Sequence, residues 1–213
     1  MFYTALLLPS CQLNRTAADR PVSHPFLCAD YGANMIRIVS AQGEIVWEYG
    51  VNRPQDVWQL RNGNILFTHL RGVKEITRDK QVIWEYENEK PNEVHSCQPL
   101  PNGIVMVALS GLCEILEIDR SGNIIKTVKL TTGQKKPHAQ MRQARKLRNG
   151  NYLVGHNSDR VVREYDPSGK VVRTIAVEGN PYGGIRLPNG NTLIGCGDGH
   201  KIIEVDPEGK IVW

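Results

Sequence analysis

The chain has 213 residues, of which 40% are apolar and 23% charged, and its formal net charge at pH 7 is +4. This composition is typical of a globular protein and excludes a disordered chain, because a disordered chain has too little apolar surface to form a core. The modest charge gives no general signal for nucleic-acid binding.

The first segment, residues 1–24, contains a short apolar run that ends at Cys11. It resembles the end of a bacterial lipoprotein signal, whose cysteine is lipidated after cleavage. No Lys or Arg precedes the run, and the run is too short to span a bilayer, which a truncated start would explain. We expect an exported protein, periplasmic or lipid-anchored to the cell envelope at Cys11, with a cytoplasmic protein as the alternative.

From residue 25 onward the sequence repeats with a period of about 40 residues. Each unit has Pro-Asn-Gly or Arg-Asn-Gly, an apolar run, Asp-x-x-Gly and a second apolar run. With Gly150 aligned to Gly190, two units match without a gap: RNGNYLVGHNSDRVVREYDPSGKVV and PNGNTLIGCGDGHKIIEVDPEGKIV. Short alternating strands in repeats of this length predict an all-β chain, a β-propeller of four-stranded antiparallel blades.

About five blades are expected along the chain. They cover residues 25–50 (partial, with three strands), 54–87, 94–130, 141–177 and 182–213 (incomplete). Closed propellers have four to eight blades, and six to eight is usual for blades of this length. We therefore expect a fragment of an incomplete six- to eight-bladed propeller, with a closed five-bladed ring as the alternative.

The phrases VWQLRNGNILFTH, LPNGNTLIG and EVDPEGKIVW carry a family resemblance. They resemble the repeats of bacterial pyrroloquinoline-quinone-like, or quinoprotein-like, propellers. The resemblance covers nearly all of residues 26–213 and implies the blade. That group includes dehydrogenases, arylsulfotransferases, assembly scaffolds and uncharacterised members, so the resemblance names no single activity. The quinone-docking motif of its dehydrogenases is echoed only at its end, in Asp206-Pro-Glu-Gly-Lys-Ile-Val-Trp213. We therefore predict no cofactor and no bound pyrroloquinoline quinone.

The five cysteines form no CxxC pair, and no spacing of ligand residues indicates a metal site. Cys97 and Cys113 fall in neighbouring strands and would be bridged only in an exported protein; buried free thiols are the alternative. Asp119, Asp166 and Asp206 begin turns before the outermost strands, where they are expected to cap backbone N–H groups.

The innermost strand of each blade lines the central channel of a propeller, so its polar residues converge from several blades. Five residues before the last Leu of each inner strand stand Gln55, His95, Arg142 and Tyr182. One position later stand Asp56, Ser96, Gln143 and Gly183, and His69 and His156 match each other at the ends of two second strands. This pattern predicts a ligand-binding ring at one channel mouth, formed by Gln55, Asp56, His69, His95, Ser96, Arg142, Gln143, His156 and Tyr182.

Such a ring suits a small anionic or polyhydroxylated ligand, because Arg142 offers a guanidinium fork and His95 exchanges a proton near neutral pH. The first functional hypothesis is a non-catalytic propeller that binds such a ligand, or a protein partner, at this mouth. The alternative is an enzyme acting on an anionic or sugar-like substrate, similar to arylsulfotransferases or to lyases of acidic sugars. Its candidate catalytic residues are His95, Arg142 and Tyr182.

The segment Gln134–Arg148 holds six cations and no acid. A phosphate or sulfate contact and an ordinary solvated loop both fit this pattern. Aromatic residues are not interleaved with the cations, so no nucleic-acid partner is predicted.

Overall fold

Five antiparallel sheets follow one another along the chain, each built from strands that are consecutive in sequence. The computed structural model describes residues 23–89 and 92–213; Cys11 and the rest of residues 1–22 lie outside the described part. The all-β prediction and the five blades are confirmed. Within the described residues, no helix has the length and apolar character needed to cross a bilayer.

The first and last blades have three strands and the middle three have four. The strands are β1 (Phe26–Asp30), β2 (Met35–Val39) and β3 (Ile45–Gly50); β4 (Val57–Gln59), β5 (Ile65–His69), β6 (Gly72–Ile76) and β7 (Val82–Glu87); β8 (Val94–Pro99), β9 (Val105–Leu109), β10 (Glu114–Ile118) and β11 (Ile124–Lys129); β12 (Ala144–Lys146), β13 (Tyr152–His156), β14 (Val161–Tyr165) and β15 (Val171–Ala176); and β16 (Pro181–Arg186), β17 (Thr192–Cys196) and β18 (Lys201–Val205). Short 3₁₀ turns cover Pro101–Gly103 (η2), Ser110–Leu112 (η3) and Pro137–Ala139 (η4).

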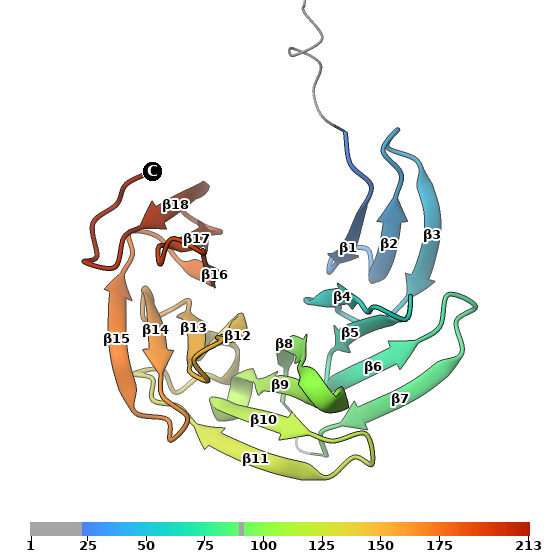
Figure 1. Cartoon of the computed structure of the whole chain (residues 1–213), viewed down its shortest axis with the longest axis horizontal. Helices are drawn as coiled ribbons and strands as arrows, with labels where there is room; N and C mark the ends of the chain where they lie inside the picture. Colours follow the sequence, from blue (N-terminus) through green and yellow to red (C-terminus); the bar gives the residue numbers. More distant parts are fainter. Residues whose placement is uncertain (1–22, 90–91) are drawn as a thin grey trace, which may run out of the picture.

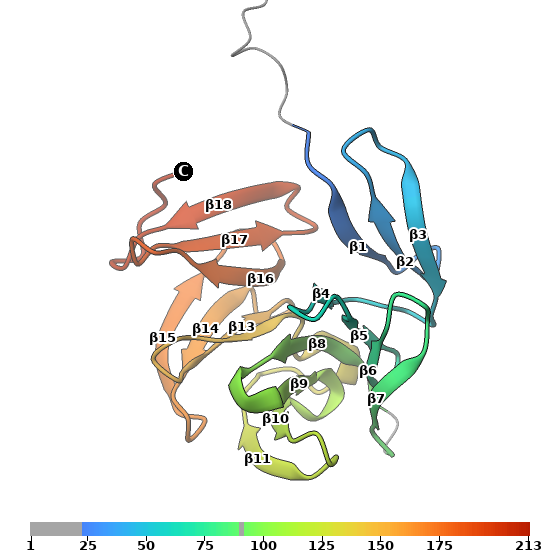
Figure 2. The ribbon, with the colours of Figure 1, turned by 45° about the vertical axis from the view of Figure 1, so that its right-hand side comes forward.

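The blades are arranged radially around one axis (Figure 1). Strands β4, β8, β12 and β16 lie nearest the centre, and β3, β7, β11 and β15 form the rim. The turned view in Figure 2 shows the blades as separate sheets stacked around this axis. The inner strands therefore begin at one mouth of the channel and end at the other.

The apolar core lies between the blades. Four buried clusters each join two successive blades; in one of them Met106 and Ile115 of the third blade pack with Tyr152 and Tyr165 of the fourth. The middle three blades pack against a neighbour on both faces, so β5, β9 and β13 are buried at nearly every position, whereas the rim strands β7, β11 and β15 are mostly exposed.

The repeated turn motifs form the hairpins expected of them. In Arg61-Asn62-Gly63 the N–H of Gly63 donates to the carbonyl of Leu60 over 2.9 Å, and Gly63 has φ +86°, which glycine adopts without strain. The side chain of Asp166 accepts hydrogen bonds from the backbone N–H groups of Ser168 and Lys170. The carboxylates that open these turns therefore satisfy backbone donors, as their positions indicate.

The sequence predicts that the second blade begins at residue 54, but its inner strand β4 begins at Val57. Pro54 has no N–H, and the N–H groups of Gln55 and Asp56 both donate to the Thr68 hydroxyl, each over 3.0 Å. The Thr68 side chain thus supplements the ladder at the start of this strand, where the N–H of Thr68 still donates to the carbonyl of Asp56 over 3.0 Å.

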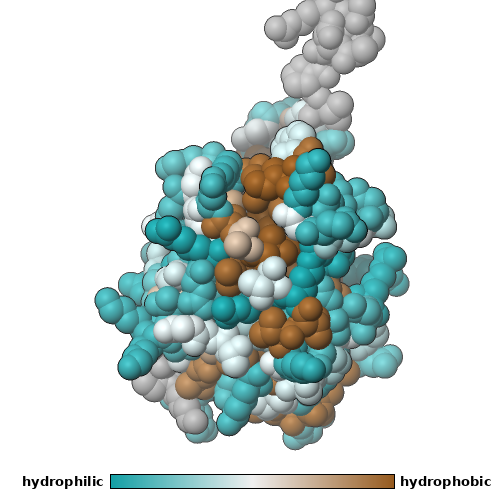
Figure 3. Space-filling view, turned by 90° about the vertical axis from the view of Figure 1, so that its left-hand side faces the viewer, coloured by the Kyte–Doolittle hydropathy of each residue, from teal (hydrophilic) through white to brown (hydrophobic). Residues whose placement is uncertain are grey.

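The outward face of the last blade is open to solvent. Ile202 on β18 is 57% exposed, whereas Val162, its equivalent in the preceding blade, is fully buried against the last blade. Figure 3 views the side of β15 and β18 and shows apolar residues gathered among hydrophilic ones. The same strand pattern therefore produces either a packed face or an exposed one, depending on whether a blade lies against it.

Candidate functional site

The residues predicted five places before the end of each inner strand only partly converge. His95, at the start of β8, Arg142, just before β12, and Tyr182, at the start of β16, lie at one mouth of the channel. Two further residues join them, Glu93 just before β8 and His138 in η4. We call these five residues the histidine mouth.

Glu93 is the centre of the histidine mouth. Its Oε2 atom lies 2.6 Å from Nε2 of His95 and 2.6 Å from Nδ1 of His138. The two imidazole rings meet edge to face with their centroids 5.4 Å apart. The His95 side chain is 1% exposed and that of His138 is 53% exposed. One carboxylate thus links a buried histidine to an accessible one.

The hydrogen bonds of His138 determine its tautomer. Nη2 of Arg142 lies 2.7 Å from Nε2 of His138, and a guanidinium only donates. Nε2 of His138 must therefore accept, so the ring hydrogen is on Nδ1 and is donated to Glu93. His138 thus links the Glu93 carboxylate to the Arg142 guanidinium through its two ring nitrogens.

His95 faces acceptors on both sides. Its Nδ1 lies 3.1 Å from the carbonyl oxygen of Met141, and its Nε2 faces Glu93. Only the imidazolium can donate to both, yet burial lowers the pKa of His95, and the nearby Arg142 charge lowers it further against the pull of Glu93. The neutral ring is left with one unsatisfied contact. The protonation of His95 is therefore sensitive to any charge added near Arg142.

The pKa of Glu93 is lowered, although burial alone would raise it. Burial raises the pKa of this carboxyl group, but the hydrogen bonds from His95 and His138 outweigh it and hold the pKa below its usual value. Glu93 is consequently ionised at neutral pH. The histidine mouth thus has a fixed negative charge beneath a cation.

Arg142 is positioned by two blades. Its backbone N–H donates to the carbonyl of Gly155 over 2.9 Å, and its guanidinium carbon lies 5.2 Å from the centre of the Tyr182 ring. Nε of Arg142 is buried without a hydrogen-bond partner. Among the described residues, no carboxylate lies within ion-pair distance of Arg142. It is a cation held in place by a ring and an imidazole, with its charge uncompensated by direct contact.

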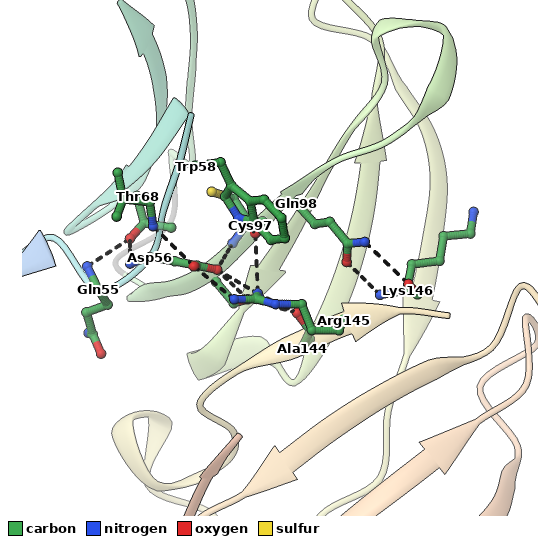
Figure 4. Close-up of polar contacts among 11 residues, drawn as sticks. Gln55, Asp56, Trp58, Thr68, Cys97, Gln98, Ala144, Arg145 and Lys146 are labelled. Atoms are coloured by element: carbon green, nitrogen blue, oxygen red, sulfur yellow. Dashed lines mark hydrogen bonds and ion pairs between the residues drawn. The ribbon is translucent and has the colours of Figure 1, made fainter. Parts of the chain in front are cut away.

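Asp56 lies elsewhere, in a network with Arg145 that spans three blades (Figure 4), and Ser96 belongs to the same network. Nη1 of Arg145 lies 2.7 Å from Oδ2 of Asp56 and Nη2 lies 2.9 Å from Oδ1, a two-pronged ion pair. The Ser96 hydroxyl donates to Asp56 over 3.0 Å, as does the N–H of Cys97. Both oxygens of the carboxylate already accept hydrogen bonds within this network. The network therefore joins blades, and Asp56 is not available to bind a ligand.

The other predicted residues have separate surroundings. The Gln143 amide packs against Gly183, with Oε1 2.1 Å from where a Cβ on that glycine would stand. Gln55 is half-buried, and its backbone N–H is the group that donates to Thr68. His69 lies at the end of β5 with Nε2 3.8 Å from Oε1 of Glu85. Among the contacts of the described residues, none joins Gln55 or His69 to the histidine mouth, and their role as ligand residues stays a prediction.

His156 supports the histidine mouth from behind. It is fully buried; Nδ1 donates to the carbonyl of Gln140 over 2.7 Å, and Nε2 lies 2.6 Å from the Tyr165 hydroxyl. Burial lowers its pKa to about 4, so the ring is neutral at pH 7. Because Gln140 follows η4, His156 anchors the loop that carries His138.

Two residues that sequence reasoning did not include are central to these groups. Glu93 stands two positions before His95, and strand alternation would have placed both on the same face. Arg145 gives no such signal, because its partner Asp56 is 89 positions away. Cys97 and Cys113 are free thiols in the structure, as are the other cysteines of the described part, Cys28 and Cys196.

Glu93, His95 and His138 also offer ligand-type atoms within 4.8 Å of one another, a spacing at which such atoms can hold a metal ion. The hydrogen bonds at His138 oppose that use. Coordination through Nδ1 would require the hydrogen to move to Nε2, where it would face an Arg142 donor. The geometry thus favours a proton-sharing and anion-facing site over a metal site.

Comparison with known proteins gives a family and a fold. The family model described as Mala_s_1-like, Mal s 1 allergenic protein-like, matches residues 34–212. No curated protein matches the chain. A crystal structure of a protein of unknown function from Bacteroides caccae is 34% identical, with a TM-score of 0.81, and the match covers 90% of this chain and 72% of that one.

More distant solved structures share the propeller fold. Virginiamycin B lyase from Staphylococcus aureus is 17% identical, with a TM-score of 0.64 and coverage of 89% of this chain and 69% of that one. The WD40 propeller domain of Doa1 is 16% identical, with a TM-score of 0.66 and coverage of 84% and 59%. At these identities the likeness concerns the fold alone.

Proposed function

The chain belongs to the Mal s 1 allergenic protein-like family, and from that premise we propose that it is a non-catalytic binding propeller whose site is the histidine mouth. The observation that carries the proposal is Arg142, a fixed guanidinium with no carboxylate in contact among the described residues. Such a cation binds an oxyanion with little loss of side-chain entropy, because its geometry is already fixed.

The ligand class follows from the groups that a ligand would reach. Arg142 is half-buried, Tyr182 is 43% exposed and the His138 side chain is 53% exposed, so a cation, a phenol and an imidazole face the solvent together. These groups suit a small carboxylate that also carries hydroxyl groups, such as a sugar acid. The quinoprotein-like repeat is part of this proposal as a description of the blade, and no quinone is included.

Binding would be coupled to a proton. Burial lowers the pKa of His95 most, and the Arg142 charge lowers it further. A carboxylate at Arg142 would offset the second effect and so favour the protonated ring, which can donate to both Glu93 and Met141. Affinity is therefore expected to rise as the pH falls towards the pKa of free His95. Calorimetry in two buffers of different ionisation enthalpy would measure the proton taken up.

The test is a titration with D-galacturonate, with neutral D-galactose as the comparison. Replacing Arg142 with glutamine should weaken galacturonate binding by about 10- to 100-fold, because a hydrogen bond to a charged group contributes about 1.5–3 kcal/mol. Arg61→Gln is the matched control, since Arg61 is exposed in the turn after β4, outside the histidine mouth, and should bind as the wild type does.

Two outcomes would overturn the proposal. One is equal affinity of the wild type and Arg142→Gln for galacturonate. The other is the absence of binding at millimolar concentration in both acidic and neutral buffer.

An enzyme acting on an acidic sugar is the second candidate, and the link from Glu93 to the accessible His138 favours it. A carboxylate that orients an imidazole is a common arrangement in general base catalysis. Among distant relatives in fold, virginiamycin B lyase is an enzyme, and a catalytically inactive histidine-to-alanine variant of it has been crystallised with quinupristin. His95 is too buried to reach a substrate directly, so this candidate requires His138→Gln to abolish elimination from a polyuronate while galacturonate still binds.

A further inference from the structure

The opposite mouth of the channel holds a pocket of about 590 Å³, separate from the histidine mouth. It is formed by the ends of the inner strands and by the turns that follow β12 and β16. Two positions before the last Leu of each inner strand stand Trp58, Gln98, Arg145 and Ile185, and all four line it. The repeat thus brings a second set of equivalent residues together, at the other end of the channel. We call this the basic pocket.

Three cations in the wall of the basic pocket are held from behind by carboxylates. Arg145 pairs with Asp56 over 2.7 Å, Lys146 with Glu117 over 2.6 Å, and Arg186 with Glu164 over 2.7 Å. The three carboxylate side chains are 7–9% exposed, and none of them lines the pocket. Each cation is therefore fixed in position while its carboxylate stays out of reach of a ligand.

A fourth cation, Arg148, is exposed at the rim of the pocket. Among the described residues, no carboxylate lies within ion-pair distance of it. Nε of Arg186 is buried and has no hydrogen-bond partner. Among the residues that the structure describes, the lining thus has basic side chains and no acidic one, and the charge of one cation, Arg148, is uncompensated.

Five of the other lining residues are apolar, one of them aromatic, and the remaining two, Gln98 and Asn149, are polar and uncharged. The Trp58 indole is fixed because Nε1 donates to the carbonyl of Cys97 over 2.7 Å, and the Arg145 guanidinium lies 5.0 Å from its ring centre (Figure 4). Ile185, in the same lining, is 55% exposed, and Leu187 and Pro188 follow it in the chain. An apolar side chain left this exposed in a recess gains most from a ligand that covers it.

We propose that the basic pocket is a second binding site, for a small anion with a flat apolar body, such as an aromatic carboxylate. Arg148, the cation of the lining whose charge is uncompensated among the described residues, binds the anionic group, and Trp58 and Ile185 bind the apolar body. The volume fits a molecule of a few rings, since ligand pockets commonly measure about 300–1,000 Å³. This site is independent of the histidine mouth, so either can fail without the other.

The same features disfavour a nucleic acid. Single-stranded nucleic acid is bound by several aromatic rings along a basic groove, whereas Trp58 is the one aromatic residue of this lining. Three of the four cations are already neutralised by their partners, which leaves little charge for a run of phosphates.

The test uses 2-naphthoate as the probe, with neutral 2-naphthylmethanol as its uncharged counterpart, titrated by calorimetry into the full chain. We expect one naphthoate to bind per chain and the alcohol to bind at least about 10-fold more weakly. Ile185→Glu should weaken naphthoate binding at least about 10-fold, because it places a carboxylate in the pocket. Arg148→Gln should weaken it about 3- to 10-fold.

Matched controls separate the pocket from the rest of the surface. Arg61 stands in an Arg-Asn-Gly turn equivalent to the one that begins at Arg148. Ile83 on β7 is 56% exposed, close to the 55% of Ile185. Arg61→Gln and Ile83→Glu should bind naphthoate as the wild type does. Equal urea midpoints of all four variants would establish that they are folded.

The proposal is overturned if naphthoate does not bind, or if Ile185→Glu and Arg148→Gln bind it normally. It is also overturned if binding is lost in Arg142→Gln, which would assign the probe to the histidine mouth. Tight, steeply salt-dependent binding of a single-stranded oligonucleotide that excludes naphthoate would likewise contradict it.

Discussion

Replacing Asp56 with alanine is expected to lower the free energy of unfolding by about 3–5 kcal/mol, because it leaves the Arg145 guanidinium buried without its counter-charge. The Arg145 side chain is 15% exposed and the Asp56 side chain 9%. The Asp56 carboxylate also accepts hydrogen bonds from Ser96 and Cys97. The loss therefore affects three blades at once. Urea unfolding followed by tryptophan fluorescence measures it.

A solvent-exposed ion pair is the control. Arg71, just before β6, pairs with Glu87 at the end of β7, and their side chains are 50% and 47% exposed. Glu87→Ala should therefore leave the urea midpoint unchanged within error. The paired variant Asp56→Ala/Arg145→Met should recover part of the lost stability, because no charge is then left buried. If Asp56→Ala unfolds at the wild-type midpoint, the network does not hold the blades together.

Replacing Gly169 with alanine is expected to destabilise the fold by about 2–5 kcal/mol, the sum of left-handed backbone strain and a steric clash. Gly169 has φ +89°, and a Cβ there would stand 2.3 Å from the backbone carbonyl oxygen of Lys129 in the preceding blade. A backbone atom cannot rotate away, so the two blades must separate. Urea unfolding again measures the effect.

The chain supplies a matched control for this clash. Gly209 occupies the same turn one repeat later, with φ +95° and no atom within 4 Å of the position of a Cβ. Gly209→Ala should therefore cost only the backbone strain, about 1–2 kcal/mol. Equal losses for the two variants would mean that the contact between the third and fourth blades is looser than described.

The fold was largely readable from the sequence because its information is local and repeated. The Arg-Asn-Gly and Asp-x-x-Gly turns define where strands end, and strand alternation defines the buried face. Counting back from Leu100 and Leu147 placed His95 and Arg142 at one mouth of the channel, and they do meet there through His138 and Glu93.

The candidate site was less predictable because its contacts cross between blades. Periodicity gives the face on which a side chain lies, but not its partner in the next sheet. Asp56 and Ser96 occupy ring positions equivalent to Gln143, yet both contact Arg145 of another blade, a partner that their positions in the repeat do not indicate. Gly169 and Gly209 are likewise equivalent in sequence, and only the blade arrangement distinguishes them.

The two mouths of the channel illustrate how a repeat creates sites. Residues at or just before the starts of β8, β12 and β16 form most of the histidine mouth, and residues near the ends of β4, β8, β12 and β16 line the basic pocket. The histidine mouth contains ionisable groups joined by hydrogen bonds, whereas the basic pocket contains a tryptophan, an isoleucine and cations paired with buried carboxylates. Different ligands are therefore expected at the two ends of one channel.

The central claim, that His95 and Arg142 belong to one electrostatic site, is tested most directly by a pH titration of the histidine ring nitrogens by NMR, assigned with single His→Gln variants. Burial and Arg142 lower the pKa of His95, so we predict a midpoint below 6.5 that rises in Arg142→Gln, while His156 stays at about 4 in both proteins. A His95 midpoint at its ordinary value, unmoved by Arg142→Gln, would contradict the account.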